Sequence, residues 1–448
     1  MFGPNILSNS PSPSPDDWSQ KFQSELKQDF ENSLRWRMQG GLNISSYQST
    51  ININSKQLAF NQNSQLHATK WLNIPEFSLH SIKEINQQLA TSPQKGLDGF
   101  ICNLRKAKEF QSQEEINPGE HHLFFKSNND AFQILNYVFE SSNITSGGLA
   151  NDPIANWMQG DAPYQETLDI ICTNIEKSIL HPNFYPLMVE NHIYHQAGAN
   201  TVLETALFLS AVVNYLDILT SKGISPGTAL NAMFFSISVG PTYLTEIAKL
   251  RAIRILIKQI GLSYGIPFDD IHPFVQATNS QFHQTRIEEN SNILRYSTEA
   301  MSAAIGGANA ITITPHSIKE SEKSLAETLA SNCSLILAQE SYLGHVADPL
   351  AGSYHIEELT EEIRVQSWQL FLEIEAKGGL LEYYNSGELR SRLDLSWFEK
   401  QEKLKDEVII GVNKYKMEPT PNIKTTEPES PMIPSRNLAD SYFINSIA

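Results

Sequence analysis

Apolar and polar positions alternate along most of this chain in a way that predicts strands separated by helices. Short apolar runs typical of buried strands occur at residues 96–104, 121–126, 144–150, 185–194, 234–239, 271–277, 308–314 and 342–347. Helical periodicity lies between most of them, at residues 130–140, 164–179, 201–219, 245–260, 292–305 and 318–338. Eight strands alternating with helices predict an α/β fold, a (β/α)8 TIM barrel over residues 96–415. The pattern alone leaves a doubly wound open sheet as the alternative.

The two flanks of this region have a different composition. Residues 1–15 are rich in Ser, Pro and Asn and are predicted to be disordered. An N-terminal arm is expected over residues 16–95, with helices at 17–33 and 78–89 and an extended stretch between them. Residues 416–448 contain repeated prolines among Glu, Thr and Ser, which is the composition of a linker or tail.

Two helix starts carry the spacing of a capping box, in which a hydroxyl residue precedes a glutamate by three positions. Thr201 and Glu204 have this spacing at one predicted helix, and Ser317 and Glu320 have it at another. We therefore expect Thr201 to cap the helix that begins there. Gly223 is predicted to end the same helix as its C′ residue.

Composition and charge exclude several classes of protein. The formal net charge of −17 argues against nucleic-acid binding, which needs clustered cations. No run of 18 apolar residues predicts a membrane span, and the N-terminus lacks the features of a secretory signal. Cys102, Cys172 and Cys333 are widely spaced and odd in number, which indicates thiols in a reducing compartment, and no Cys/His group has zinc-ligand spacing. We expect a cytoplasmic protein with no metal site.

The stretch HIYHQAGAN, residues 192–200, follows a predicted strand and leads into a helix, where a barrel places catalytic groups. His192 and His195 are therefore candidates for acid/base catalysis, although histidines at strand ends often have structural roles. Arg251 and Arg254 lie on a later helix. They are predicted either to bind the phosphates of coenzyme A or to lie on a solvated or intersubunit helix face.

Several long motifs, in one order, resemble the methylmalonyl-CoA mutase family, and within it the small (beta) subunits of two-chain bacterial enzymes. They are LRWRMQGGLNISSY (34–47), GGLANDPIANW (147–157), GPTYLTEIAKLRAIRIL (240–256), STEAMSAAIGGANAI (297–311), ILAQESYLGHVADPLAGSYHIEELT (336–360) and VIIGVNKY (408–415). The resemblance covers about residues 17–416. It implies a barrel in which an acyl-CoA lies along the axis and is rearranged by radicals that adenosylcobalamin generates.

The same resemblance implies that the chemistry of the site has been lost. The family's cobalt-coordinating motif, Asp-x-His-x-x-Gly, has no counterpart here, so we expect no cobalamin-binding domain and no cofactor bound by this chain. The family's catalytic histidine aligns with Ile193, its substrate-binding glutamine with Ala150, and its His-x-Gln-Thr pattern with residues 275–278, where Val275 and Ala277 stand in place of polar residues. No catalytic residue is predicted, with His192 and His195 as weak candidates.

These observations predict a non-catalytic small subunit in a heterodimer with the large (alpha) subunit, which would hold the adenosylcobalamin. The arm at residues 16–95 is expected to contact that partner. Two alternatives are an active mutase barrel whose cobalamin domain is on a separate protein, and a stand-alone barrel enzyme that uses His192 or His195.

Overall fold

The structure is a computed structural model of the 448-residue chain. It describes residues 14–26, 36–37, 42–44, 54–65, 69–104, 115–127, 134, 137, 144–160, 163–286, 288–315, 323–404, 407–415 and 433–439. The expected capping box at Ser317, most of the helix expected at 130–140 and most of the predicted tail lie outside these residues.

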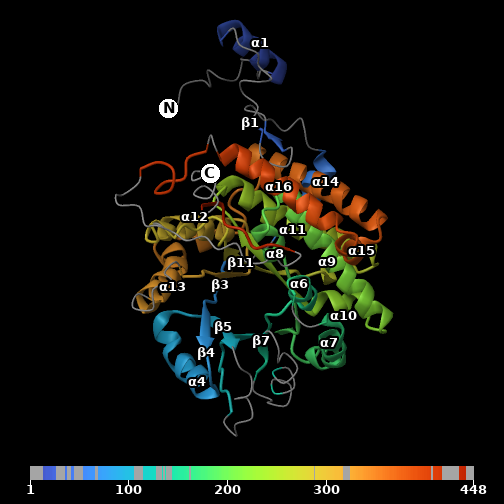
Figure 1. Cartoon of the computed structure of the whole chain (residues 1–448), viewed down its shortest axis with the longest axis vertical. Coiled ribbons are helices and arrows are strands. Elements are labelled where there is room, and N and C mark those ends of the chain that lie inside the picture. Colours follow the sequence, from blue (N-terminus) through green and yellow to red (C-terminus); the bar gives the residue numbers. More distant parts are fainter. Residues whose placement is uncertain are drawn as a thin grey trace, which may run out of the picture.

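Ten short strands form two five-stranded parallel sheets (Figure 1). The first sheet has the order β4 (Glu76–Leu79), β5 (Gly99–Leu104), β6 (His122–Lys126), β7 (Ser146–Leu149), β8 (Asn183–Tyr185). The second has the order β9 (Leu187–Glu190), β10 (Met233–Val239), β11 (Phe274–Asn279), β12 (Ala310–Thr312), β3 (Leu72–Asn73). Within each sheet, neighbouring strands are consecutive in the sequence, except that β12 lies next to β3. A doubly wound sheet requires a reversal of strand order in its middle, so this alternative is wrong.

The edge strands of the two sheets follow each other directly in the chain. β3 leads into β4 across Ile74 and Pro75, and β8 leads into β9 across Pro186. A proline has no amide hydrogen, which interrupts the ladder at these points. Hydrogen bonds still run across one break: Ile74 N–H donates to Ile311 O (3.1 Å) and Ile101 N–H donates to Pro75 O (2.9 Å). Each edge of one sheet therefore continues into an edge of the other.

The structure corrects three expectations about the strands. Residues 342–347 contain a 3₁₀ turn, η8 (Leu343–His345), preceded by Tyr342 at φ 55°, and not a strand. The strand expected at 185–194 ends at Glu190, and His192–Gln196 is the short helix α8. Strands β3 and β4 instead lie within the predicted N-terminal arm, so its boundary at residue 95 does not separate it from the sheets. Pro75 splits this strand into two pieces too short to give a clear apolar run.

Helices cover the outer faces of both sheets. Those expected from the sequence are present as α1 (Pro15–Leu26), α4 (Ile82–Thr91), α7 (Tyr164–Ser178), α9 (Thr201–Ser221), α11 (Tyr243–Ser263), α12 (Ser291–Ile305) and α13 (Lys323–Gln339). Short elements complete this part: β1 (Trp36–Arg37), β2 (Asn43–Ile44), α3 (Ser55–Asn63), η4 (Pro93–Lys95), α6 (Pro153–Met158), α10 (Pro226–Asn231) and η6 (Phe268–Asp270).

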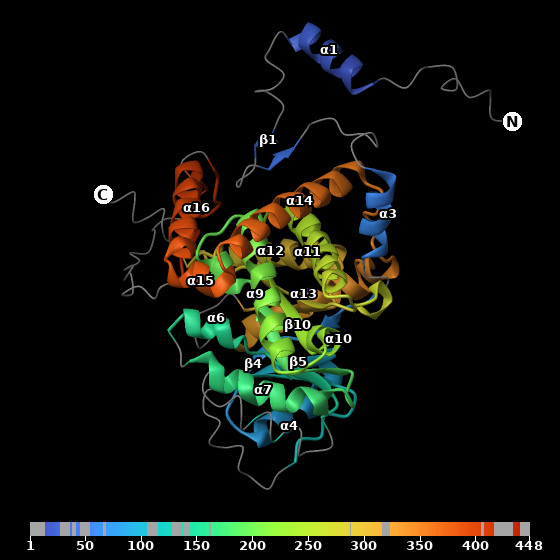
Figure 2. The same cartoon turned by 90° about the vertical axis from the view of Figure 1, so that its right-hand side faces the viewer.

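Three C-terminal helices were not anticipated: α14 (Tyr354–Ala376), α15 (Gly379–Asn385) and α16 (Glu388–Leu404). α14 packs on α9 and α11, and Figure 2 shows it crossing the molecule on the side away from β4 and β5. Helix α1 lies apart from the sheets in both views.

Helix α9 is bounded at its two ends by Asn200 and Gly223. Asn200, and not Thr201, is the N-cap, because its side chain accepts from the N–H of Leu203. The capping-box expectation for Thr201 is therefore wrong, and the Glu204 side chain instead contacts His195 and Lys249. Gly223 does end the helix, at φ 90°, as predicted. By length and composition α9 is the one helix in the described ranges that could span a membrane, but 78% of its apolar window is buried inside the protein, as in a core helix.

Candidate functional site

A polar cavity of about 540 Å³ lies where the strands of both sheets end. Inward-facing residues of β10 and β11 form one wall: Ser236 and Ser238 from β10, and Gln276 and Thr278 from β11. Their outward-facing neighbours, such as Ile237 and Val275, pack in the larger apolar cluster under the helices. This cavity is at the carboxyl ends of the strands, where barrel enzymes bind their substrates.

Below this cavity the interior between the sheets is filled by aromatic rings. Phe124 (β6), Tyr185 (β8), Phe234 (β10) and Phe274 (β11) belong to a cluster separate from the outer core. The ring centroids of Tyr185 and Phe274 are 4.8 Å apart, those of Phe124 and Phe234 are 5.2 Å apart, and Phe124 lies 6.2 Å from Phe274. We call these four residues the aromatic layer. At these centroid distances the paired rings are in contact with each other.

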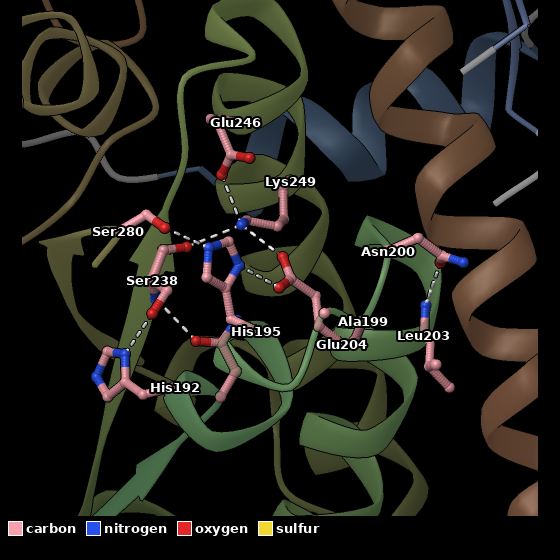
Figure 3. Close-up of polar contacts among 12 residues, drawn as sticks. His192, His195, Ala199, Asn200, Leu203, Glu204, Ser238, Glu246, Lys249 and Ser280 are labelled. Atoms are coloured by element: carbon pink, nitrogen blue, oxygen red, sulfur yellow. Dashed lines mark hydrogen bonds and ion pairs between the residues drawn. The ribbon is translucent and has the colours of Figure 1, made fainter. Parts of the chain in front are cut away.

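The turn after β9 places both candidate histidines at this end of the strands. Asn191 is fully buried, and its Oδ1 accepts from the N–H of Ser238, which fixes the start of α8 against β10. Gly198 then turns the chain at φ 91°, with its Cα against Trp397, where a side chain would meet that ring at 3.0 Å. The side chains of His192 and His195, both on the short helix α8, point in different directions (Figure 3).

His192 lines the polar cavity but uses both ring nitrogens on protein groups. Its Nε2 lies 2.7 Å from Ser236 Oγ and its Nδ1 lies 2.5 Å from Ser238 Oγ. Ser236 donates its own hydroxyl to Gln276 Oε1 (2.9 Å), so Ser236 accepts from His192 Nε2 and Ser238 donates to His192 Nδ1. Burial lowers the pKa of His192 to about 3. The ring is neutral at pH 7 and has no free nitrogen for a substrate.

His195 is buried in a separate polar network behind α8. Its Nδ1 donates to Glu204 Oε2 (2.6 Å), and its Nε2 lies 2.7 Å from Ser280 Oγ. This order of contacts is similar to a Ser-His-Glu triad. Ser280 is only 1% exposed, however, and lines neither this cavity nor the one beside the network. The Ser280 hydroxyl is therefore enclosed by the protein.

One lysine lies between the two carboxylates of this network. Lys249, fully buried, lies 2.6 Å from Glu204 Oε1 and 2.5 Å from Glu246 Oε2, and donates to Ser238 O (2.8 Å). Burial alone would raise the pKa of Glu204, but Lys249 and His195 lower it to about 2. Burial likewise opposes the charge on Lys249, yet the two carboxylates raise its pKa. The network ties α9, α11 and β10 together.

Carboxylates dominate the charge of the polar cavity. Glu76 pairs with Lys126 (3.1 Å). The Asp152 carboxylate binds backbone groups. It caps α6 by accepting from the N–H of Ala155, and it also accepts from the N–H of Glu190. Among the described residues, the Glu190 side chain pairs with His192 Nε2 at 3.8 Å, and burial next to Asp152 raises the pKa of Glu190 to about 8. An anionic ligand would find one paired lysine here and no free cation among the described residues that line the cavity.

The positions expected to be degenerate fall into two groups. Ala150 and Ile193 line the polar cavity, at positions where the family resemblance implies polar groups. Val275 and Ala277 face outward into the apolar core, while their neighbours Gln276 and Thr278 face the cavity. The strand therefore presents a polar pair to the cavity, one residue out of step with the expected pattern.

Arg251 and Arg254 meet neither solvent nor a phosphate site. Arg251 is 1% exposed and pairs with Asp348 and with Glu357 (3.0 Å). Arg254 is 3% exposed and donates to the carbonyl oxygens of Pro273 (2.9 Å) and Gly307 (2.7 Å). Both expectations for these arginines are wrong, because the helix that carries them is enclosed by its neighbours on nearly every side.

Most of the residues that determine the character of this site could not be recognised from the sequence. The aromatic layer was indistinguishable from ordinary core positions, and Glu190 looked like one charge at the end of an apolar run. One pattern does indicate the site. On β10 and β11 the inward-facing residues follow Phe-x-Ser-x-Ser and Phe-x-Gln-x-Thr, so the inner face is apolar at first and becomes polar towards the carboxyl end.

The two candidate histidines do not fit as ligands of a corrinoid cobalt. Coordination would require an imidazole nitrogen that is free to bind the metal. The nitrogens of His192 and His195 are all used within the protein, and His283 Nδ1 lies 3.1 Å from Ser280 Oγ, with burial holding the pKa of His283 well below its usual range. In the part of the chain that the structure describes, no group of three or more His, Cys, Asp or Glu could hold a metal ion.

Comparison with known proteins identifies the family. The family model described as methylmalonyl-CoA mutase matches residues 138–439, more than half of the chain. The methylmalonyl-CoA mutase small subunit of Porphyromonas gingivalis is 26% identical over 447 residues, covering 92% of this chain and 71% of that one. The small subunits of Streptomyces virginiae and Propionibacterium freudenreichii subsp. shermanii are 33% and 30% identical, but their alignments cover 52% and 66% of this chain.

The coverage of these relatives is uneven. The chain spans 38% of the Streptomyces protein and 47% of the Propionibacterium protein, less than half of each. A protein of Rhizobium meliloti named methylmalonyl-CoA mutase, without a subunit in its name, is 30% identical over 61% of this chain. Because the family match covers both sheets from β7 onward and the helices around them, the chain belongs to the methylmalonyl-CoA mutase family.

Proposed function

We propose that this chain is a small, non-catalytic subunit of an adenosylcobalamin-dependent methylmalonyl-CoA mutase, the enzyme that interconverts methylmalonyl-CoA and succinyl-CoA. In this proposal the two sheets are the halves of one closed (β/α)8 barrel. The support is that both edges of one sheet run on into the edges of the other at Pro75 and Pro186. The separate inner cluster, which draws residues from strands of both sheets, is the expected core of such a barrel.

The aromatic layer is the observation that carries the non-catalytic role. The family resemblance implies that an acyl-CoA lies along the barrel axis of a catalytic chain. In the proposed barrel, Phe124, Tyr185, Phe234 and Phe274 would lie on that axis, and the aromatic pairs that they form support this placement. A substrate chain would have to displace four aromatic side chains, each of which contributes several kcal/mol of burial. The one lysine that lines the cavity among the described residues is already paired with Glu76, so it offers an anionic substrate little attraction.

The partner in this proposal is a large subunit, which holds the cobalamin and carries out the reaction. The support is that several relatives are named small subunits. This chain would stabilise the partner in a cytoplasmic heterodimer. A subunit that has lost its active site can still be retained in a heterodimer, because the interface that it forms contributes to the stability of the complex.

Co-expression with the candidate large subunit tests the proposal. Only this chain is tagged, and the purified material is examined for complex mass, cobalamin absorbance and turnover of methylmalonyl-CoA. We expect a one-to-one active complex, and neither pigment nor turnover for this chain alone. Turnover by the isolated chain with added cobalamin, or no association with any large subunit, contradicts the proposal.

A variant separates a structural role from a catalytic one within the complex. His192→Gln removes the one imidazole that lines the polar cavity while keeping a hydrogen-bonding side chain. We expect the kcat of the complex to change by less than about twofold, whereas loss of a general base costs about 10²-fold or more. The same substitution at exposed His272 is the matched control.

A further inference from the structure

A second cavity, of about 640 Å³, lies beside the buried network, and His195 and Glu204 are among the residues that line it. It is bounded by the first turns of α9 and α11, by α12 and α16, and by chain segments near residues 408 and 438. Its walls are mostly apolar, with contributions from Leu42, Leu294, Val408, Ile409, Leu438 and Ala439. This volume is within the range of cavities that bind small organic ligands.

One buried cation faces this cavity without a counter-ion. Lys400, on α16, is 7% exposed and lines the cavity. Its Nζ donates one hydrogen bond, to Ala199 O (2.9 Å), and lies 4.7 Å from the centroid of the Phe282 ring. An ammonium group has three donors, and no carboxylate lies within ion-pair distance of this one among the described residues. Burial lowers the pKa of Lys400 to about 8, which reflects the cost of that isolated charge.

Two carboxylates that line the cavity already have partners within the protein. Glu204 and Glu246 line it too, but Lys249 lies between them and His195 binds Glu204 on the other side. Arg295 and Lys403 add positive charge to the lining. The guanidinium of Arg295 binds only neutral oxygens at close range, Asn292 Oδ1 (2.9 Å) and Ile410 O (2.8 Å). Glu407, which is exposed, is the other carboxylate that lines the cavity.

We propose that this cavity binds an aliphatic carboxylate, with the carboxylate on Lys400 and the hydrocarbon chain along the apolar wall. A carboxylate accepts two or more hydrogen bonds and so satisfies the donors that Lys400 leaves unused. The apolar wall removes the hydrocarbon from water, which supplies the remaining affinity. The site is independent of the polar cavity and of the role proposed above, since none of its residues belongs to the aromatic layer.

Titration calorimetry with decanoate and with decanol tests the site in the full chain. The two probes have the same hydrocarbon length and differ in charge, and both are used below the concentration at which they form micelles. We expect decanoate to bind with saturation at one site and decanol to bind at least tenfold more weakly. Equal affinities, or no saturable decanoate binding, overturn the proposal. This comparison needs no variant and so does not depend on a substitution folding.

A pair of lysine substitutions then locates the carboxylate. Lys400→Met keeps an unbranched side chain of similar length and removes the charge, so decanoate affinity should fall at least tenfold to the level of decanol. Lys414→Met removes an exposed lysine that does not line the cavity, and it should leave both affinities unchanged. A Lys400→Met protein that still prefers decanoate to decanol would place the carboxylate elsewhere and refute the assignment.

Discussion

Phe234 and Phe274 are paired neighbours on β10 and β11, and their rings lie nearly perpendicular, 82° apart with centroids separated by 6.5 Å. Two residues further along each strand, Ser236 and Gln276 are paired in the same register and joined by a hydrogen bond. One pair of strands thus forms both the floor and the wall of the polar cavity. The interior is filled by apolar side chains below the cavity and is hydrogen-bonded along its wall.

Phe234→Ala should destabilise the protein by about 3–5 kcal/mol, because it removes a fully buried ring and leaves a cavity that the strands cannot close. Urea unfolding at pH 7 measures the change. Phe398→Ala, which removes a ring that is 61% exposed, is the matched control and should cost less than about 0.5 kcal/mol. A loss below 1 kcal/mol for Phe234→Ala would mean that the aromatic layer is not tightly packed.

Asn200→Ala should cost about 1 kcal/mol, since Asn200 caps α9 by accepting from the N–H of Leu203. Thr201→Ala at the next position should change stability by only a few tenths of a kcal/mol, because the threonine hydroxyl makes no capping hydrogen bond. Thermal unfolding of the two variants compares them directly. The reverse ranking would restore the capping box that the sequence pattern predicted.

Periodicity predicted most strands and the helices that follow them, because each has one buried face and a long enough run to show it. It missed β3 and β4, which Pro75 divides, and α14 to α16, which pack against other helices and not against a sheet. At the site it located His192 and His195 but not their partners. Ser236, Glu204 and Ser280 come from different elements, and their convergence is a property of the tertiary structure. The difference between Asn200 and Thr201 as the cap is set by backbone geometry at one residue.

Lys249→Met should destabilise the protein by about 3–5 kcal/mol, because Glu204 and Glu246 would be left buried as neighbouring carboxylates. Adding Glu246→Gln to that variant removes one of these charges, while His195 still binds Glu204. The double variant should therefore be more stable than Lys249→Met alone. Equilibrium unfolding of the single and double variants gives the coupling energy. If the two losses simply add, the ion cluster is not the source of the effect.

His192 should make the protein sensitive to acid. Its folded pKa, about 3, lies below its ordinary value of 6.5, so between these values the unfolded chain binds a proton that the folded chain does not. The stabilising contribution is complete above pH 6.5 and is lost as pH falls through 3. His192→Gln should reduce the loss of unfolding free energy between pH 7 and pH 4 by about 1–3 kcal/mol. Urea titrations at several pH values measure it, with His272→Gln as the histidine control; identical slopes for all three proteins would contradict the assignment.

Glu190 should act in the opposite direction at high pH. Burial next to Asp152 raises its folded pKa from 4.5 to about 8, so the folded chain holds a proton that the unfolded chain has lost. Its contribution is complete below pH 4.5 and is lost as pH rises through 8. Glu190→Gln mimics the protonated form, and at pH 9 it should be more stable than the unaltered chain by about 1–3 kcal/mol, with the difference shrinking towards pH 5. Glu388→Gln, at a surface ion pair with Lys377, is the control for charge removal and should show no such trend. A variant that is less stable than the parent at pH 9 would show that Glu190 is ionised in the folded protein and held by a cation.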